Sequence, residues 1–129
     1  MSNLPTIIIK SIPHNRQHYK TVGNYWRDKN GTLQFRVSQF GDEYEQFAVI
    51  LHELIEAFLC QKRGIKWKKI DKFDKKYEKN RKEGDLSEPG NDPKAPYYRE
   101  HRFAENLERQ LIHELGIDWF KYNDKVDNL

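Results

Sequence analysis

The sequence contains a single cysteine, Cys60, and no long run of hydrophobic residues. One cysteine cannot form a disulfide within the chain, which indicates a reducing compartment. The mean hydropathy of -1.01 is too low for the roughly 18 consecutive apolar residues of a membrane helix. The first residues also lack the basic start and the long apolar segment of a signal peptide. We therefore expect a cytoplasmic protein with no membrane partner.

A strong excess of charge of one sign is also lacking, since 23 Lys and Arg stand against 20 Asp and Glu, a net charge of +3. The basic residues are nevertheless concentrated, because Lys62–Lys82 contains many of them and only Asp71, Asp74 and Glu78 as acids. A polyanionic partner such as nucleic acid is therefore to be sought at Lys66–Lys82. The lysine-covered face of an ordinary solvated helix explains the same pattern.

The length fits one domain, because 129 residues with 36% hydrophobic residues are enough for a single core. The period of the hydrophobic pattern changes once, near position 42. The sequence therefore predicts a single domain over 1–129, with a β-rich part over 1–41 and a helical part over 42–129.

The β-rich part predicts the strands Thr6–Ile12, Thr21–Arg27 and Thr32–Gln39. The last two flank a turn that ends in Gly31, which is the signal of a hairpin. In the third strand apolar residues alternate with polar ones, so one face packs and the other meets water. We expect a small three-stranded antiparallel sheet.

The helical part predicts three helices, over about 42–62, 66–82 and 93–115. Asp42, with Glu45 three residues later, resembles a capping box, and Gly116 can stop the third helix. The segment 83–96 contains two Gly and three Pro and is expected to be a long surface loop. The order of elements predicts an α+β fold with the helices on one face of the sheet.

The first predicted helix carries the candidate chemistry. Between Phe47 and Cys60 its only charged or ionisable residues are His52, Glu53 and Glu56. At about 100° per residue these three fall together on one edge of the helix. A helix this apolar is expected to be largely buried, and buried titratable groups are costly unless they are paired, hydrogen-bonded or bound to a metal. Their grouping therefore requires an explanation.

His52 and Glu56 are four residues apart, so their side chains point the same way. This is the spacing with which H-E-x-x-H helices present two zinc ligands around a general-base glutamate. Here the pattern is H-E-x-x-E, so His52 and Glu56 are the candidate metal ligands and Glu53 is the candidate catalytic base. The alternative is a buried His–Glu pair that only locks the helix to a neighbour, for example through Arg99 or Arg102.

A further ligand is expected from the third helix. His101 is the first candidate for this position. Glu100 and Glu105 are alternative ligands, or carboxylates that orient the imidazole from behind. A site without any of these three residues remains open.

With these residues the chain resembles a minimal zincin, the metallopeptidase-like fold in which a small sheet precedes the active-site helix and a later helix completes the site. The resemblance rests on the segment His52–Glu56, on the strands before it, and on Glu100 and His101 after it. It implies one divalent metal, a metalloprotease-like hydrolase activity with Glu53 as the base, and a peptide or protein substrate. The resemblance implies Zn²⁺, whereas the oxygen-richer H-E-x-x-E site favours Mn²⁺ or Fe²⁺.

The sequence is also similar, more loosely, to small proteins of phages and prophages with the pattern HEL-[IV]-EA, a Pro/Gly/Asp-rich loop, and EH-x-FA. A phage-encoded protein is expected in the host cytoplasm. That resemblance leaves open a protein that binds and inhibits a host protein on the same scaffold, without turnover.

A different reading joins Glu53 and Glu56 with Glu105 and Glu108 as two E-x-x-E pairs on facing helices. This arrangement is similar to the Mg²⁺ site of the MazG-type nucleotide pyrophosphohydrolases, which implies nucleoside triphosphates as substrates. The β-rich first third and the long separation of the two pairs argue against it.

Overall fold

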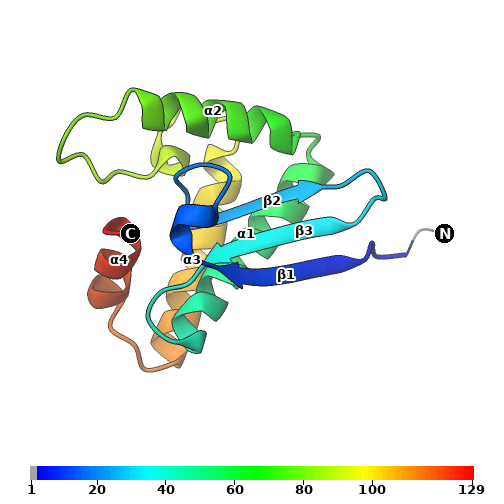
Figure 1. Ribbon diagram of the computed structural model, residues 1–129. Helices are drawn as coiled ribbons and strands as arrows, with labels where there is room; N and C mark the ends of the chain where they lie inside the picture. Colours follow the sequence, from blue (N-terminus) through cyan, green and yellow to red (C-terminus); the bar gives the residue numbers. More distant parts are fainter. Residues whose placement is uncertain (1–2) are drawn as a thin grey trace.

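The computed structural model describes residues 3–129 and has an α+β fold (Figure 1). The strands of its sheet are β1 (Ile7–Ile12), β2 (Gly23–Arg27) and β3 (Leu33–Ser38). The described part of the chain has four α-helices: α1 (Glu43–Lys62), α2 (Trp67–Lys79), α3 (Tyr98–Glu114) and α4 (Trp119–Asp127). Short 3₁₀ turns lie at His14–Arg16 and Pro89–Asn91.

The sheet is mixed, with the strand order β1-β3-β2. β2 and β3 form the predicted antiparallel hairpin, but β1 pairs with β3 in parallel. The prediction of a wholly antiparallel sheet is therefore wrong at β1. The chain between β1 and β2 crosses the end of β3, where the side chain of Gln17 donates hydrogen bonds to the carbonyl oxygens of Val22 and Arg36 at 3.3 and 3.2 Å. Because β3 inserts between the first two strands, β1 and β2 follow one another in the sequence but are not neighbours in the sheet.

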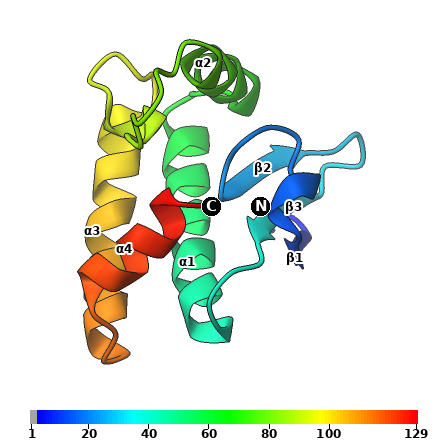
Figure 2. The ribbon, with the colours of Figure 1, turned by 60° about the vertical axis from the view of Figure 1, so that its left-hand side comes forward.

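The layers follow from the alternation in β3. Leu33, Phe35 and Val37 are buried, as predicted, and α1 covers the face that they form. Figure 2 shows α1 between the sheet and α3, with α4 against α3. The capping box is confirmed, since the Asp42 carboxylate accepts from the backbone N–H groups of Tyr44 and Glu45, while the Glu45 carboxylate accepts from that of Asp42.

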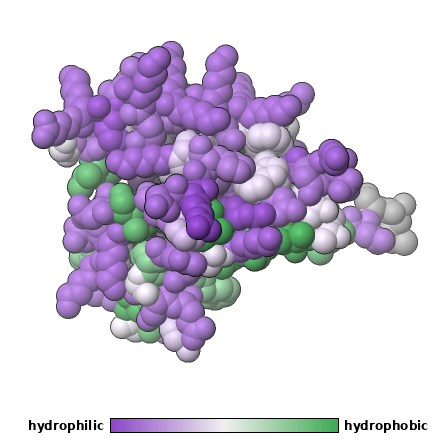
Figure 3. Space-filling view, in the orientation of Figure 1, coloured by the Kyte–Doolittle hydropathy of each residue, from purple (hydrophilic) through white to green (hydrophobic). Residues whose placement is uncertain are grey.

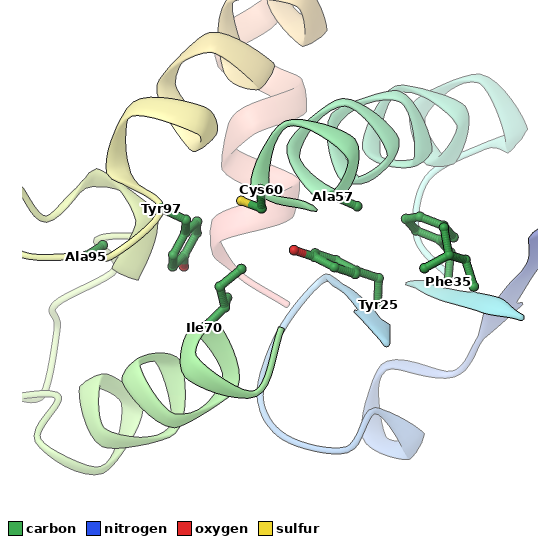
Figure 4. Close-up of a cluster of buried hydrophobic side chains, with 8 residues drawn as sticks. Tyr25, Phe35, Ala57, Cys60, Ile70, Ala95 and Tyr97 are labelled. Atoms are coloured by element: carbon green, nitrogen blue, oxygen red, sulfur yellow. The ribbon is translucent and has the colours of Figure 1, made fainter. Parts of the chain in front are cut away.

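Two hydrophobic clusters hold these layers together. In the first, Tyr25 and Phe35 from the sheet, Cys60 from α1, Ile70 from α2 and Tyr97 from the start of α3 meet (Figure 4). The second joins β3, α1, α3 and α4 and consists of Val37, Ala48, Val49, Ile112 and Tyr122. Both clusters include residues of α1. The side chains at the middle of α1 lie between the two clusters.

The helical part differs from the prediction in number. Gly116 ends α3 with a positive φ of 73°, but the tail then forms the additional helix α4. Tyr122 anchors α4 in the core, whereas Phe120 is 76% exposed. The third helix begins later than predicted, because the Asp92 carboxylate accepts from the backbone N–H of Lys94 and keeps that segment in a turn.

Two further observations bear on partners. Within residues 3–129 no helix combines the length and the apolar character that crossing a bilayer requires. The lysines of α2 are exposed, and hydrophilic side chains project from this helix along one side of the molecule (Figure 3).

Candidate metal centre

The buried face of α1 is polar at its centre. His52, Glu53 and Glu56 are only 7%, 8% and 4% exposed, although the rest of the helix is largely apolar. α3 lies across from them and contributes His101 and Glu108, which are also buried. His52 and Glu56 are four residues apart, and His101 and Glu108 are seven apart. These spacings bring the side chains to the facing surfaces of the two helices.

Three donor atoms from this interface converge. Nε2 of His52 lies 2.9 Å from Oε2 of Glu56 and 3.2 Å from Nδ1 of His101. Nδ1 of His101 lies 3.1 Å from the same Glu56 oxygen. A tetrahedral ion with bonds of about 2.0–2.1 Å holds its ligand atoms about 3.3 Å apart. His52, Glu56 and His101, here called the histidine–glutamate group, are therefore placed so that they could hold a metal ion.

The other nitrogen of each imidazole is held by a carboxylate. Nδ1 of His52 lies 2.7 Å from Oε1 of Glu108, and Nε2 of His101 lies 3.1 Å from Oε2 of Glu88. The hydroxyl of Tyr122 donates to the second oxygen of Glu108. Metal-ligating histidines characteristically donate their second N–H to such a carboxylate, which fixes the tautomer and the orientation of the ring.

The protonation of the group follows from these contacts. Burial alone would lower the pKa of His52, but hydrogen bonds to Glu108 and Glu56 hold it well above its usual value. Burial also opposes the charged form of His101, yet Glu56 and Glu88 raise its pKa to about 9. Burial would raise the pKa of Glu56, and its hydrogen bonds to His101 and His52 lower it to about 2 instead. Protons therefore compete with a metal ion for the imidazole nitrogens.

Glu53 lies beside the group but is not part of it. Its carboxylate packs against Gly23 at the start of β2, where a Cβ atom would lie 2.5 Å from its Oε1. Burial and the charge of Glu56 raise its pKa to about 8. In the part of the chain that the structure describes, no group is hydrogen-bonded to this carboxylate. Glu53 is therefore a buried acid whose oxygens are free to bind a water molecule or a substrate.

The loop 83–96 is not a plain surface loop. It supplies Glu88, and its Gly90 packs on the ring of His101 so closely that a Cβ atom would lie 2.4 Å from the ring carbon Cγ. Gly90 and Ala95 are buried. This segment therefore forms one wall of the site.

A cavity of about 150 Å³ lies over the group and over Glu53. Its far side is formed by Asp74 of α2, which is 7% exposed and accepts hydrogen bonds from the hydroxyls of Tyr97 and Tyr19 at 2.5 and 3.0 Å. Burial is the main cause that raises the pKa of Asp74 to about 7. The cavity is thus lined by acids on both sides.

The remaining candidates from the sequence lie elsewhere. Glu100 is buried and forms an ion pair of 2.6 Å with Arg63. Glu105 is half-buried on α3 and is not one of the converging residues. Arg99 and Arg102 are exposed, and Arg102 lies over the ring of Tyr98. In the described residues neither arginine forms an ion pair with the site.

Sequence reasoning missed the supporting role of Glu88 and Glu108. Glu108 lies seven residues after His101 on the same face of α3, and this spacing could have identified it. Glu88 lies in a loop rich in proline and glycine, where no periodicity relates one side chain to another. Tyr122 gave no signal beyond its aromatic character.

The support from Glu108 can be tested by Glu108→Gln, with Glu105→Gln on the same helix as the matched control. We expect Glu108→Gln to weaken metal binding about 10- to 100-fold, because an amide holds the imidazole less firmly than a carboxylate. Glu105→Gln should leave the affinity unchanged. Competition with a chromophoric chelator measures both, and equal affinities for the two variants would contradict the role of Glu108.

Comparison of the chain with models of protein families, with curated proteins and with solved structures found no match. The class of this protein is therefore described by its fold and its candidate site alone. It is an α+β protein in which two histidines and a glutamate, buried between two helices, could hold a metal ion.

Proposed function

We propose that this protein is a metal-dependent hydrolase of the minimal zincin type, with one Zn²⁺ ligated by His52, Glu56 and His101. One observation carries the proposal. Three donor atoms from two helices converge within 3.2 Å of one another, while carboxylates hold both imidazoles from behind. This arrangement is what a metal site requires.

The competing interpretation is a set of hydrogen bonds that only joins α1 to α3. In that case both imidazoles share Oε2 of Glu56, and if both rings are protonated two N–H groups face each other across 3.2 Å. Such like charges repel in a buried site. A divalent ion in place of the two protons keeps the total charge and removes this repulsion, so the geometry favours the metal.

The donor set supports zinc among the possible metals. Two imidazoles and one carboxylate form the ligand set of well-known catalytic zinc sites. Mg²⁺ prefers an environment of oxygen ligands and is disfavoured by the two nitrogens. The same set also suits Fe²⁺, and the glutamate oxygen suits Mn²⁺, so the metal content of the purified protein decides between them.

Glu53 gives the site its hydrolytic character. A bound zinc ion lowers the pKa of water toward about 7 and polarises a carbonyl group. Burial and the charge of Glu56 raise the pKa of Glu53 to about 8, and a divalent ion beside it would lower that pKa again, because a nearby cation favours the carboxylate. The ionised Glu53 would then take a proton from water and return it to a leaving group, as a general base and then a general acid. Gly23 leaves the space that this carboxylate occupies. Its free oxygens beside the histidine–glutamate group support hydrolysis over a purely structural metal site.

We propose a peptide or protein as the substrate, in keeping with the zincin resemblance. A protein that only binds a partner through this scaffold is the alternative. The MazG-like reading has less support, because Glu108 is hydrogen-bonded to His52 and Tyr122 and Glu105 is not one of the converging residues.

Elemental analysis of protein purified without a histidine tag tests the proposal, followed by an assay on a pool of peptides. One equivalent of zinc with peptide cleavage that a chelator abolishes is the expected result. Zinc without cleavage would support the binding scaffold and overturn the hydrolase. Two metal equivalents with hydrolysis of nucleoside triphosphates would favour the MazG-like site. Protein that binds no metal would overturn the proposal as a whole.

A further inference from the structure

The side of α1 that faces away from the histidine–glutamate group is apolar, and its N-terminal part is open to solvent. Tyr44 and Phe47 are 53% and 49% exposed. Leu51, Leu54 and Phe58 continue the same face and are partly buried, the last two because they also pack against the first hydrophobic cluster. We call these five residues the outer face of α1. Exposed aromatic residues that continue into an apolar helix face make it a candidate interaction surface.

The spacing of the outer face is that of a helix that packs on another helix. The steps between its residues are three, four, three and four, which is the a/d pattern of a heptad repeat. On the neighbouring helix α3, Phe103 is also 50% exposed. A shallow groove between the helices is lined by Leu51, Leu107 and Leu111 together with polar and charged residues of α3.

We propose that the outer face of α1 binds the same face of a second copy of this chain, with the two helices antiparallel. A two-fold axis at the middle of α1 then places Leu51 against Leu54 of the second copy and Phe47 against its Phe58. The leucines thus meet each other and the phenylalanines meet each other, while Tyr44 lies opposite Gln61. The face is therefore complementary to itself, as a two-fold interface requires.

The charges at the ends of α1 fit this arrangement. In the same register Glu43 in the first turn lies opposite Lys62 in the last turn of the second copy. Opposite charges thus meet at both ends, and the antiparallel helix dipoles also attract. A parallel pair would bring Glu43 against Glu43 and Lys62 against Lys62, which argues against it.

Sedimentation equilibrium of the full chain tests the inference, with Phe47→Glu as the variant and Phe120→Glu as the matched control. Phe120 is the more exposed of the two and lies on α4, so its substitution should leave the dimer intact. We expect a wild-type dimer and, for Phe47→Glu, a dissociation constant raised at least ~100-fold, as for a buried aromatic anchor. A wild-type monomer at roughly 100 µM, a concentration that saturates an interface of ordinary affinity, would overturn the proposal.

The direction of the helices is tested by cysteine cross-linking, since Glu43 and Lys62 are exposed and Cys60 is buried. Glu43→Cys and Lys62→Cys proteins are mixed and oxidised. An antiparallel pair gives the mixed disulfide between the two variants. Disulfides only between identical variants would contradict the antiparallel register. Zinc binding by Phe47→Glu should equal that of the wild type, so this proposal stands or falls independently of the metal site.

Discussion

His101→Ala is expected to lower the affinity for zinc by at least ~1,000-fold, well beyond the 10- to 100-fold effect of losing an outer partner. The imidazole of His101 is the contribution of α3 to the histidine–glutamate group. Without it, His52 and Glu56 remain as two ligands on a single helix. Titration of the metal-free protein against a competing chelator measures the affinity, and His52→Ala should show a loss of similar size.

His113→Ala provides the control for this result, because His113 lies on the same helix but is exposed. It should bind zinc as the wild type does. Zinc also stabilises a protein that binds it only when folded, by about 4 kcal/mol at a thousand times the dissociation constant. The thermal unfolding temperature of the wild type and of His113→Ala should therefore rise with zinc, and that of His101→Ala should not. Unchanged affinity in His101→Ala would remove this residue from the ligand set.

The part of the site on α1 could be predicted because the helix itself fixes it. A separation of four residues determines how His52 and Glu56 point, whatever surrounds them. The placement of His101 depended on how α3 packs against α1, and no local rule supplies that. The contribution of Glu88 depends on the path of a loop, which the sequence does not encode as a periodic pattern.

In the fold, too, the features set by local sequence could be predicted and those set by long-range contacts could not. The alternation in β3 predicted its buried face, and the turn at Gly31 predicted the hairpin with β2. The parallel pairing of β1 could not be predicted, because it depends on a connection of ten residues that crosses the end of β3. Strand order is a property of long-range contacts and is not contained in the pattern of a single strand.

The burial of α1 differs from the prediction on its outer face. Its apolar character predicted a largely buried helix, but Phe47 is half-exposed while the polar His52 and Glu56 are buried. The proposed metal would explain the buried polar face, and the proposed second copy of the chain would explain the exposed apolar face. Each proposal accounts for residues that the other leaves unexplained.

Glu53→Gln is expected to abolish hydrolysis while the protein keeps its metal. Glutamine has nearly the same shape as glutamate but cannot accept a proton, so the loss should be about 10²- to 10⁴-fold in kcat, the usual contribution of a general base. Metal binding should not change, because the Glu53 carboxylate is not hydrogen-bonded to the histidine–glutamate group. Metal analysis and turnover of the same preparation, with a peptide that the wild type cleaves, measure the two effects separately.

Gly23→Ala tests the Glu53 carboxylate through a residue that lies outside α1. The added methyl group would overlap the carboxylate of Glu53, so the side chain must move although its chemistry is intact. We expect a reduced kcat with unchanged zinc content, as for Glu53→Gln but smaller in size. If both variants cleave the peptide at the wild-type rate, Glu53 does not act in the reaction, and the site binds its metal for another purpose. If Glu53→Gln instead loses zinc, the carboxylate belongs with the ligands rather than with the catalytic base.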